Sequence, residues 1–402
     1  GTRGGTHCLQ HGETLIIDAA NGVVLADTDD AMLEHFAGLR DAAISRTAEL
    51  RRKGSAPAVT QDGETLRIYA NIELAEDVEI ALANGASGIG LYRTEFLYMN
   101  RDQPPDEDEH YAAYRAVVDG MQGRPVTIRT LDLGADKQPG GTLHTAAPNN
   151  PALGLRAIRL CLKEPELFRP QLRAIMRASA HGPVRLMIPM LSGMQELNSV
   201  LTLVEQARRE LIRDGLQFDP RMPVGGMIEV PAAALALDDL APHLDFISVG
   251  TNDLLQYALA ADRIDEQVAH LYELQHPGVV RLLQAIFRDA ARLGIPASVC
   301  GEAAGDRRYT RLLLALGLRD FSMSPGRLLE VKQVILNTHI ARATAALTRW
   351  LNETDGHPQS LLEALDAVAE RVARRRSRGD GSRRRRDRAR RSSTRRSATP
   401  CR

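Results

Sequence analysis

Arginines, carboxylates and one cysteine follow a series of short apolar runs in this sequence. They come at or near the ends of the segments LYR, IRTLD, MIE, VGTND and SVCGE, as Arg93, Arg129, Asp132, Glu229, Asn252, Asp253, Cys300 and Glu302. Guanidinium groups bind phosphate or carboxylate through paired hydrogen bonds. Mg²⁺ takes one or two carboxylates together with phosphate oxygens and water, and Glu229 with Asp253 would supply such a pair. Any one of these arginines or carboxylates alone is more often a partner in a surface salt bridge.

Cys300 stands in the stretch PASVCGEAAGD, between an apolar run and Gly301. The chain has four cysteines, widely spaced and without a CxxC pair, which argues against a zinc site or a disulfide framework. A cysteine at the end of a strand is often a small core residue. If it lies beside a substrate instead, its thiol can be a nucleophile or a proton donor. The residues alone leave these alternatives open.

The elements that must position these residues form a regular series from residue 65 onward. Eight short apolar runs alternate with amphipathic helical stretches such as DEDEHYAAYRAVVDGM and HPGVVRLLQAIFRDAARLG. The runs are TLRIYANI, GIGLYRTEF, VTIRTLDLG, VRLMIPML, VGGMIEVP, FISVGTND, ASVCGEA and DFSMSP. This series predicts an α/β fold, a (β/α)₈ TIM barrel, whose active site lies at the carboxyl ends of the strands. An open doubly wound sheet is the alternative, but no GxGxxG fingerprint supports it.

A barrel would bring the strand-end residues to one mouth. Arg93, Arg129 and Arg263, which lies ten residues past Asp253, would face Glu229 and Asp253 there. Three guanidinium groups beside two carboxylates suit a polyanionic substrate together with a hard cation. We therefore expect a small, phosphorylated, acidic substrate and Mg²⁺.

Composition argues against a membrane protein or a secreted protein. The 402 residues are 44% apolar and 4% aromatic, enough to bury a large core. No apolar run is long enough to cross a membrane, and the N-terminus lacks the charged and apolar regions of a signal peptide. We expect no membrane contact and a cytoplasmic location.

Pattern changes along the chain predict five segments. Residues 1–29, with the strand-like stretches ETLIIDA and GVVLAD, are read as the remnant of another domain, and residues 30–64 as a linker helix and loop. The barrel spans residues 65–350 and a C-terminal helix residues 351–370. Residues 371–402 contain fifteen arginines and two aspartates, a surplus of +13 that leaves −13 for the rest of this neutral chain. We expect this tail to be disordered, and without aromatic residues we do not expect it to bind nucleic acid.

Eight ordered motifs between residues 14 and 350 resemble one family. They are ASGIGLYRTEFLYMNRDQPPDEDEHYAAY, TIRTLDLGADK, NPALGLRAIR, QLRAIMRASAHGPVRLMIPM, IEVPAAAL, SVGTNDLLQYALAADR, VCGEAAGD and FSMSP. They resemble the phosphoenolpyruvate-binding half of Enzyme I, the phosphoenolpyruvate-protein phosphotransferase family of the bacterial sugar phosphotransferase system. Pyruvate phosphate dikinase and phosphoenolpyruvate synthase share the barrel, but RTLDLGADK and GTNDLLQYALAADR resemble Enzyme I more closely. Ala135 and Leu255 depart from the family pattern without replacing a charged residue.

The resemblance implies a role for each site residue. Arg93, Arg129 and Arg263 would bind the phosphate and carboxylate of phosphoenolpyruvate, assisted by Asn252, while Glu229 and Asp253 would bind Mg²⁺. Cys300 would be the general acid that protonates the enolate to pyruvate, and Gly301 would leave the substrate room to approach. Arg156, in GLRAIR, either reaches the phosphate or forms a structural salt bridge.

The resemblance also implies partners that this sequence does not contain. In the family, the phosphoryl acceptor is a histidine in a GG-x-T-S-H motif, and a helical domain binds the phosphocarrier HPr. Neither is present here, and His7 in RGGTHC stands too close to LIIDA to be that histidine. Residues 1–29 would be the end of the phosphohistidine domain, and the chain a fragment or truncated homologue. The family also implies a homodimer. The alternatives are a module that senses phosphoenolpyruvate without turnover, and a relative of the dikinases.

Overall fold

The computed structural model describes residues 9, 11–18, 22–52, 54, 56–133, 150–353 and 360–367. The chain divides into two compact units, Gly1–Ser55 and Ala56–Arg402. The predicted arginine-rich tail and His7 lie outside the described residues, as does Ala135.

The first unit contains a short hairpin and a long helix. Strands β1 (Ile16–Asp18) and β2 (Val23–Leu25) pair antiparallel, with Ile17 opposite Val24. Both strands fall within the two strand-like stretches expected from the sequence. Helix α2 (Asp30–Arg52) lies in the segment where a helix was expected and buries none of its side chains within the described structure.

The second unit is built on a closed parallel barrel, as predicted. Its eight strands are β4 (Thr65–Ile72), β5 (Ile89–Tyr92), β6 (Val126–Arg129), β7 (Val184–Ile188), β8 (Val224–Ile228), β9 (Phe246–Val249), β10 (Ala297–Val299) and β11 (Asp320–Met323). Each strand pairs parallel with the next, and β11 pairs with β4 to close the sheet. One strand was not expected: β3 (Ala58–Val59), in the predicted loop, pairs antiparallel with β4.

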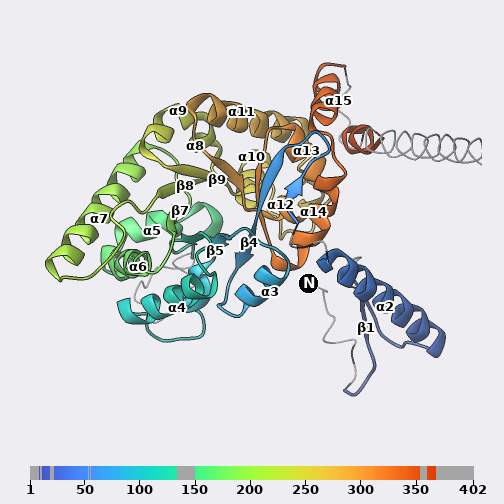
Figure 1. Cartoon of the computed structure of the whole chain (residues 1–402), viewed down its shortest axis with the longest axis horizontal. Helices are drawn as coiled ribbons and strands as arrows, with labels where there is room; N and C mark the ends of the chain where they lie inside the picture. Colours follow the sequence, from blue (N-terminus) through green and yellow to red (C-terminus); the bar gives the residue numbers. More distant parts are fainter. Residues whose placement is uncertain are drawn as a thin grey trace, which may run out of the picture. The chain divides into compact units, whose positions relative to one another are not determined.

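Helices surround the barrel and cover its outer face (Figure 1). The α-helices of this unit are α3 (Asp77–Ala83), α4 (Glu107–Gly120), α5 (Ala157–Lys163), α6 (Pro165–Ala178), α7 (Met194–Arg213), α8 (Pro231–Leu235), α9 (Leu237–Leu240), α10 (Thr251–Leu259), α11 (Pro277–Leu293), α12 (Glu302–Gly305), α13 (Thr310–Ala315), α14 (Leu328–Leu336) and α15 (Ile340–Glu353). Residues 360–367 are also helical. Among the described residues, no helix combines the length and apolarity needed to span a bilayer.

Local signals explain where several helices begin and end. Helix α4 starts at a capping box, in which Asp106 accepts from the Glu109 N–H and Glu109 accepts from the Asp106 N–H. After the eighth strand the chain forms two helices, α14 and α15, with a break between them. Asp62 accepts hydrogen bonds from the Ile340 and Ala341 N–H groups, and so caps a new helix after the break.

Alternation along the strands divides the barrel interior into levels. Near the amino ends of the strands, Arg67 and Asp320 form a salt bridge at 2.6 Å. Leu91, Met187, Met227, Phe246 and Cys300 form a separate small buried apolar cluster. Past the carboxyl ends the side chains become charged, which is where catalytic groups lie in barrel enzymes.

Candidate active site

Three carboxylates meet at the carboxyl end of the barrel. Asp132 follows β6, Glu229 follows β8, and Asp253 lies in the first turn of α10. One oxygen from each lies within 4.8 Å of the others. The structure thus brings together Glu229 and Asp253, the predicted metal pair, and adds Asp132. The sequence placed Asp132 at a strand end but held no signal that it would join this pair.

Backbone geometry around Glu229 holds its carboxylate in place. The Met190 N–H donates to Glu229 Oε1 at 2.7 Å, and Met190 adopts a left-handed conformation with φ of 56°. Gly250 stands against the other oxygen, since a Cβ there would lie 2.5 Å from Glu229 Oε2. A backbone held in a sparsely populated conformation beside a buried carboxylate is typical of a functional site.

The pKa values of Glu229 and Asp132 are shifted in opposite directions. Burial, with the negative charges of Asp132 and Asp253, raises the pKa of Glu229 to about 8. Burial acts in the same sense on Asp132, but the Arg129 and Arg156 guanidinium groups outweigh it and lower the pKa of that carboxyl. A buried carboxyl whose ionisation is opposed by its neighbours would be stabilised in its charged form by a cation.

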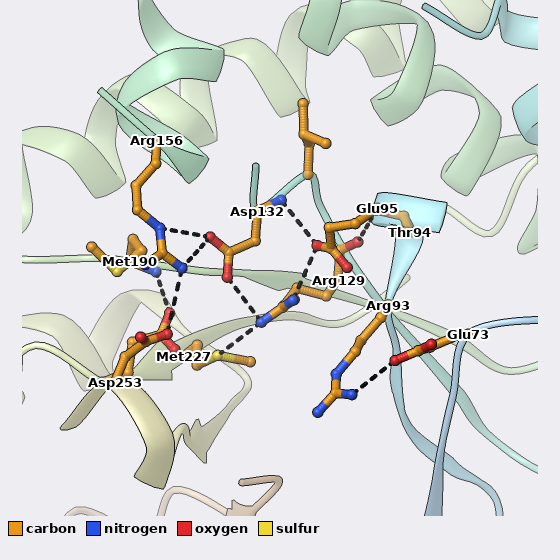
Figure 2. Close-up of polar contacts among 12 residues, drawn as sticks. Glu73, Arg93, Thr94, Glu95, Arg129, Asp132, Arg156, Met190, Met227 and Asp253 are labelled. Carbon is orange, nitrogen blue, oxygen red and sulfur yellow. Dashed lines mark hydrogen bonds and ion pairs between the residues drawn. The ribbon is translucent and has the colours of Figure 1, made fainter. Parts of the chain in front are cut away.

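Two of the predicted arginines are held by acidic side chains (Figure 2). Arg93 binds Glu73 at 3.0 Å. Arg129 binds Glu95 and Asp132, each at 3.0 Å. Burial opposes the charge of Arg129, but these carboxylates outweigh it and raise the pKa of the guanidinium group above the ordinary value. Within the described part of the chain, Arg129 Nε is buried and has no hydrogen-bond partner. It is a donor available to an anion.

Arg156 also lies in the site. Its Nη2 binds Asp132 at 2.8 Å and lies 3.5 Å from Asp253, so it contacts two of the three carboxylates. The sequence left two roles open for Arg156: a ligand of the phosphate, or a partner in a structural salt bridge. The structure gives it ion pairs with groups of the site itself, which are compatible with both roles.

Cys300 is buried immediately after β10, and its thiol lies 3.7 Å from the carbonyl oxygen of Val249. Burial raises the pKa of this thiol to about 11, and the charge of Glu229 contributes in the same direction. Asn71 donates to the Cys300 carbonyl at 2.8 Å and fixes the backbone at this point. The thiol is therefore protonated near neutral pH, the form required of an acid rather than of a nucleophile.

The remaining predicted residues lie around the same opening. Asn252 accepts from the Glu302 N–H through Oδ1 at 3.0 Å, which directs its NH₂ group elsewhere as a donor. Arg263 is exposed in the loop after α10, hydrogen-bonds Tyr272, and contributes to lowering the pKa of Asp132. Glu302 is exposed and outside the carboxylate cluster.

A glycine is needed at position 301 for a reason other than the expected room for substrate. A Cβ there would lie 1.9 Å from Thr251 Oγ1 and 2.7 Å from the Thr251 backbone nitrogen. The space that glycine leaves is occupied by Thr251, the first residue of α10, and not kept for a ligand. Its small size is needed so that the segments bearing Cys300 and Asp253 can pack together.

Comparisons of this sequence with known proteins agree on one family. A family profile described as "PEP-utilising enzyme, PEP-binding domain" matches residues 47–340. The chain is 48% identical to the phosphoenolpyruvate-protein phosphotransferase of Cupriavidus necator, over 92% of the chain and 63% of that protein. It is 42% and 40% identical to those of Staphylococcus carnosus and Bacillus subtilis, over 83% of the chain and 58% and 59% of those proteins. The chain thus spans about six tenths of the length of these relatives.

Proposed function

Because this chain belongs to the family of PEP-utilising enzymes that carry the PEP-binding domain, we propose that it binds phosphoenolpyruvate and releases pyruvate as part of a phosphoenolpyruvate-protein phosphotransferase. The observation that carries the proposal is the composition of the barrel mouth. Arginines with a buried donor, three clustered carboxylates and a protonated thiol are grouped at one end of the barrel. Those are the groups needed to hold a phosphorylated acid and to protonate its carbon.

Mg²⁺ fits the carboxylate cluster. Glu229 and Asp253 would hold it, with Asp132 close enough to contribute. The pKa of Glu229 is raised by burial and by nearby negative charge, and a cation would offset both effects. When bound, the cation would draw electron density from the phosphate and carboxylate oxygens of the substrate and so stabilise the charge that develops as the phosphoryl group leaves.

The arginines would orient the phosphoryl group for transfer. Arg93 and Arg129, with Arg156 and Arg263, would donate hydrogen bonds to substrate oxygens, assisted by the amide of Asn252. The bond between phosphorus and the enol oxygen would break as a bond forms from phosphorus to a histidine nitrogen of a further domain. From there the phosphoryl group would pass to an HPr-type carrier for sugar uptake.

Cys300 would complete the reaction. The enolate left behind has its nucleophilic carbon at the methylene group, and the thiol would donate its proton there to give the methyl group of pyruvate. The thiolate that results would regain a proton from solvent.

We also propose a homodimer that forms at the mouth face. The loops that follow the strands expose Leu153, Ile264 and Leu271, which are 64%, 82% and 50% accessible. Apolar side chains on exposed loops of one face are compatible with an apolar contact between copies. Light scattering at high protein concentration with Mg²⁺ and phosphoenolpyruvate should give a dimer, and a monomer throughout would contradict the proposal.

The central proposal is tested by calorimetry and proton exchange. Phosphoenolpyruvate should bind in the presence of Mg²⁺ and bind much more weakly when EDTA is present. With Mg²⁺, the protein should also exchange the methyl protons of pyruvate in D₂O, as observed by NMR, because the Cys300 step is reversible. Absence of both binding and exchange would overturn the proposed function.

A further inference from the structure

We infer that Gln171, on the outer layer of the barrel, is a positioning residue that sets the spacing of Arg93 and Arg129. This inference rests on the proposed function, in which the two arginines hold one substrate. Gln171 lies on α6 and is fully buried. Its hydrogen bonds go to Leu131 and Thr94, in the two segments that carry the arginines, and to Tyr114 on α4.

Gln171 connects the ends of β5 and β6. Its Oε1 accepts from the Leu131 N–H at 2.9 Å, in the segment between Arg129 and Asp132. Its Nε2 donates to Thr94 Oγ1 at 3.0 Å, and Thr94 directly follows Arg93. Thr94 in turn donates to the carbonyl of Arg129 at 3.0 Å, a bond drawn in Figure 2.

The direction of each bond follows from the backbone groups. The Leu131 N–H can only donate, so it must face the oxygen of the Gln171 amide. The NH₂ group then faces Thr94, whose hydroxyl accepts that bond and has its own proton left for the Arg129 carbonyl. The chain of bonds has one arrangement, and a residue of the same shape without an amide cannot reproduce it.

A buried aromatic pair extends the network away from the site. Gln171 Nε2 also donates to the Tyr114 hydroxyl at 3.1 Å, which lies 2.9 Å from His110 Nδ1. His110 Nε2 lies 3.1 Å from the hydroxyl of Tyr98, in the same 3₁₀ segment as Thr94. Tyr114 and His110 stand on α4, so two outer helices support the loop that bears Arg93.

Glu95 shows why the spacing matters. It follows Thr94 and receives bonds from Arg129 Nη2 and from the Asp132 N–H, both at 3.0 Å. A shift of the segment 93–95 would therefore move Arg93 and displace the partner of Arg129 at the same time. Small misplacement of groups that bind a reacting substrate lowers affinity and rate strongly.

The test compares variants that differ in the network but not in burial. Gln171→Met keeps the shape and removes every bond, while Thr94→Val removes the hydroxyl that Thr94→Ser retains. Ser179→Ala is the control, because Ser179 ends the same helix, is buried and accepts from the Asp219 N–H at 2.8 Å, at the other end of the barrel. Melting temperature and the Kd of phosphoenolpyruvate with Mg²⁺ are measured for each.

We expect Gln171→Met and Thr94→Val to raise the Kd roughly ten-fold or more, whereas Ser179→Ala and Thr94→Ser stay within about two-fold of the parent protein. If Gln171→Met does not fold, the difference in Kd between Thr94→Val and Thr94→Ser tests the inference. Variants whose affinity follows melting temperature regardless of the network would overturn the inference and leave the proposed function standing. A parent protein that does not bind phosphoenolpyruvate at all would overturn both.

Discussion

Arg156 binds Asp132 with two nitrogens directed at one oxygen: Nη2 lies 2.8 Å and Nε 3.2 Å from Oδ1. The other oxygen of Asp132 binds Arg129 Nη1 at 3.0 Å. Asp132 therefore joins two guanidinium groups from different parts of the barrel mouth. A phosphoryl group entering the site would meet two cations already held side by side, which reduces the reorganisation that binding requires.

The first prediction concerns Arg156. Arg156→Gln should weaken phosphoenolpyruvate binding roughly ten-fold to hundred-fold, because the cation that pairs with Asp132 and Asp253 is lost. Calorimetry with Mg²⁺ measures the effect. Arg159→Gln is the control, since Arg159 lies three residues further on, in α5, and pairs with Glu196 at 3.5 Å instead. Equal losses in the two variants would remove Arg156 from the site.

The second prediction concerns the cation. Glu229→Ala and Asp253→Ala should each reduce Mg²⁺-dependent binding of phosphoenolpyruvate by at least about ten-fold, because each removes a proposed ligand. Asp245→Ala should not, since Asp245 lies just before β9, where it accepts from the Val224 N–H at 2.8 Å. Mg²⁺ titration followed by calorimetry distinguishes them, and similar losses in all three would contradict the assignment.

The third prediction concerns His110 and the pH dependence of stability. Burial lowers the pKa of His110 from 6.5 to about 4, so the folded protein keeps it neutral. Below pH 6.5 the unfolded chain binds a proton that the folded chain excludes. The free energy of unfolding should therefore decrease as the pH falls from 6.5 to 4, by about 2 kcal/mol at pH 5. Above 6.5 this contribution is constant.

His110→Gln provides the comparison, because the amide can hydrogen-bond but does not titrate. Urea unfolding at pH 7 and pH 5, followed by circular dichroism, should show a larger loss of stability in the parent protein than in the variant. Parallel losses would mean that His110 is protonated in the folded state or that other groups dominate this pH range.

Much of the barrel could be predicted because its signals are local. An apolar run followed by a charged residue placed Arg93, Arg129 and Glu229 at strand ends, and strand ends of a parallel barrel share one face. The partners of those residues could not be predicted in the same way. Glu73 and Glu95 pair with Arg93 and Arg129 through the closed geometry, and no spacing rule indicates which carboxylate meets which arginine.

Buried polar residues on helices were also not predicted from the sequence. Gln171 falls in the stretch PELFRPQLRAIM, where helical spacing places it on the apolar face. A glutamine at such a position is a signal of a buried hydrogen-bond network, because an unpaired amide there would be costly. Its partners, Thr94 and Leu131, are distant in sequence and become adjacent only after the helix packs.

The last prediction separates general acid from nucleophile at Cys300. Cys300→Ala should bind phosphoenolpyruvate and Mg²⁺ about as tightly as the parent, because the charged groups are unchanged. Its exchange of pyruvate methyl protons in D₂O should be slower by roughly 10²–10⁴-fold, the usual contribution of a positioned acid. Cys161→Ala is the control, since Cys161 is equally buried but lies on α5 in the outer layer.

Phosphoryl transfer gives the second measurement. With a histidine domain supplied in trans, Cys300→Ala should still form phosphohistidine in a single turnover while pyruvate appears slowly, because the enolate must take its proton from water. A nucleophilic cysteine would instead make phosphohistidine formation itself depend on the thiol, and a phosphorylated Cys300 would be trapped in the parent protein. Unchanged exchange and unchanged pyruvate formation in the variant would show that Cys300 is a small core residue at the end of a strand.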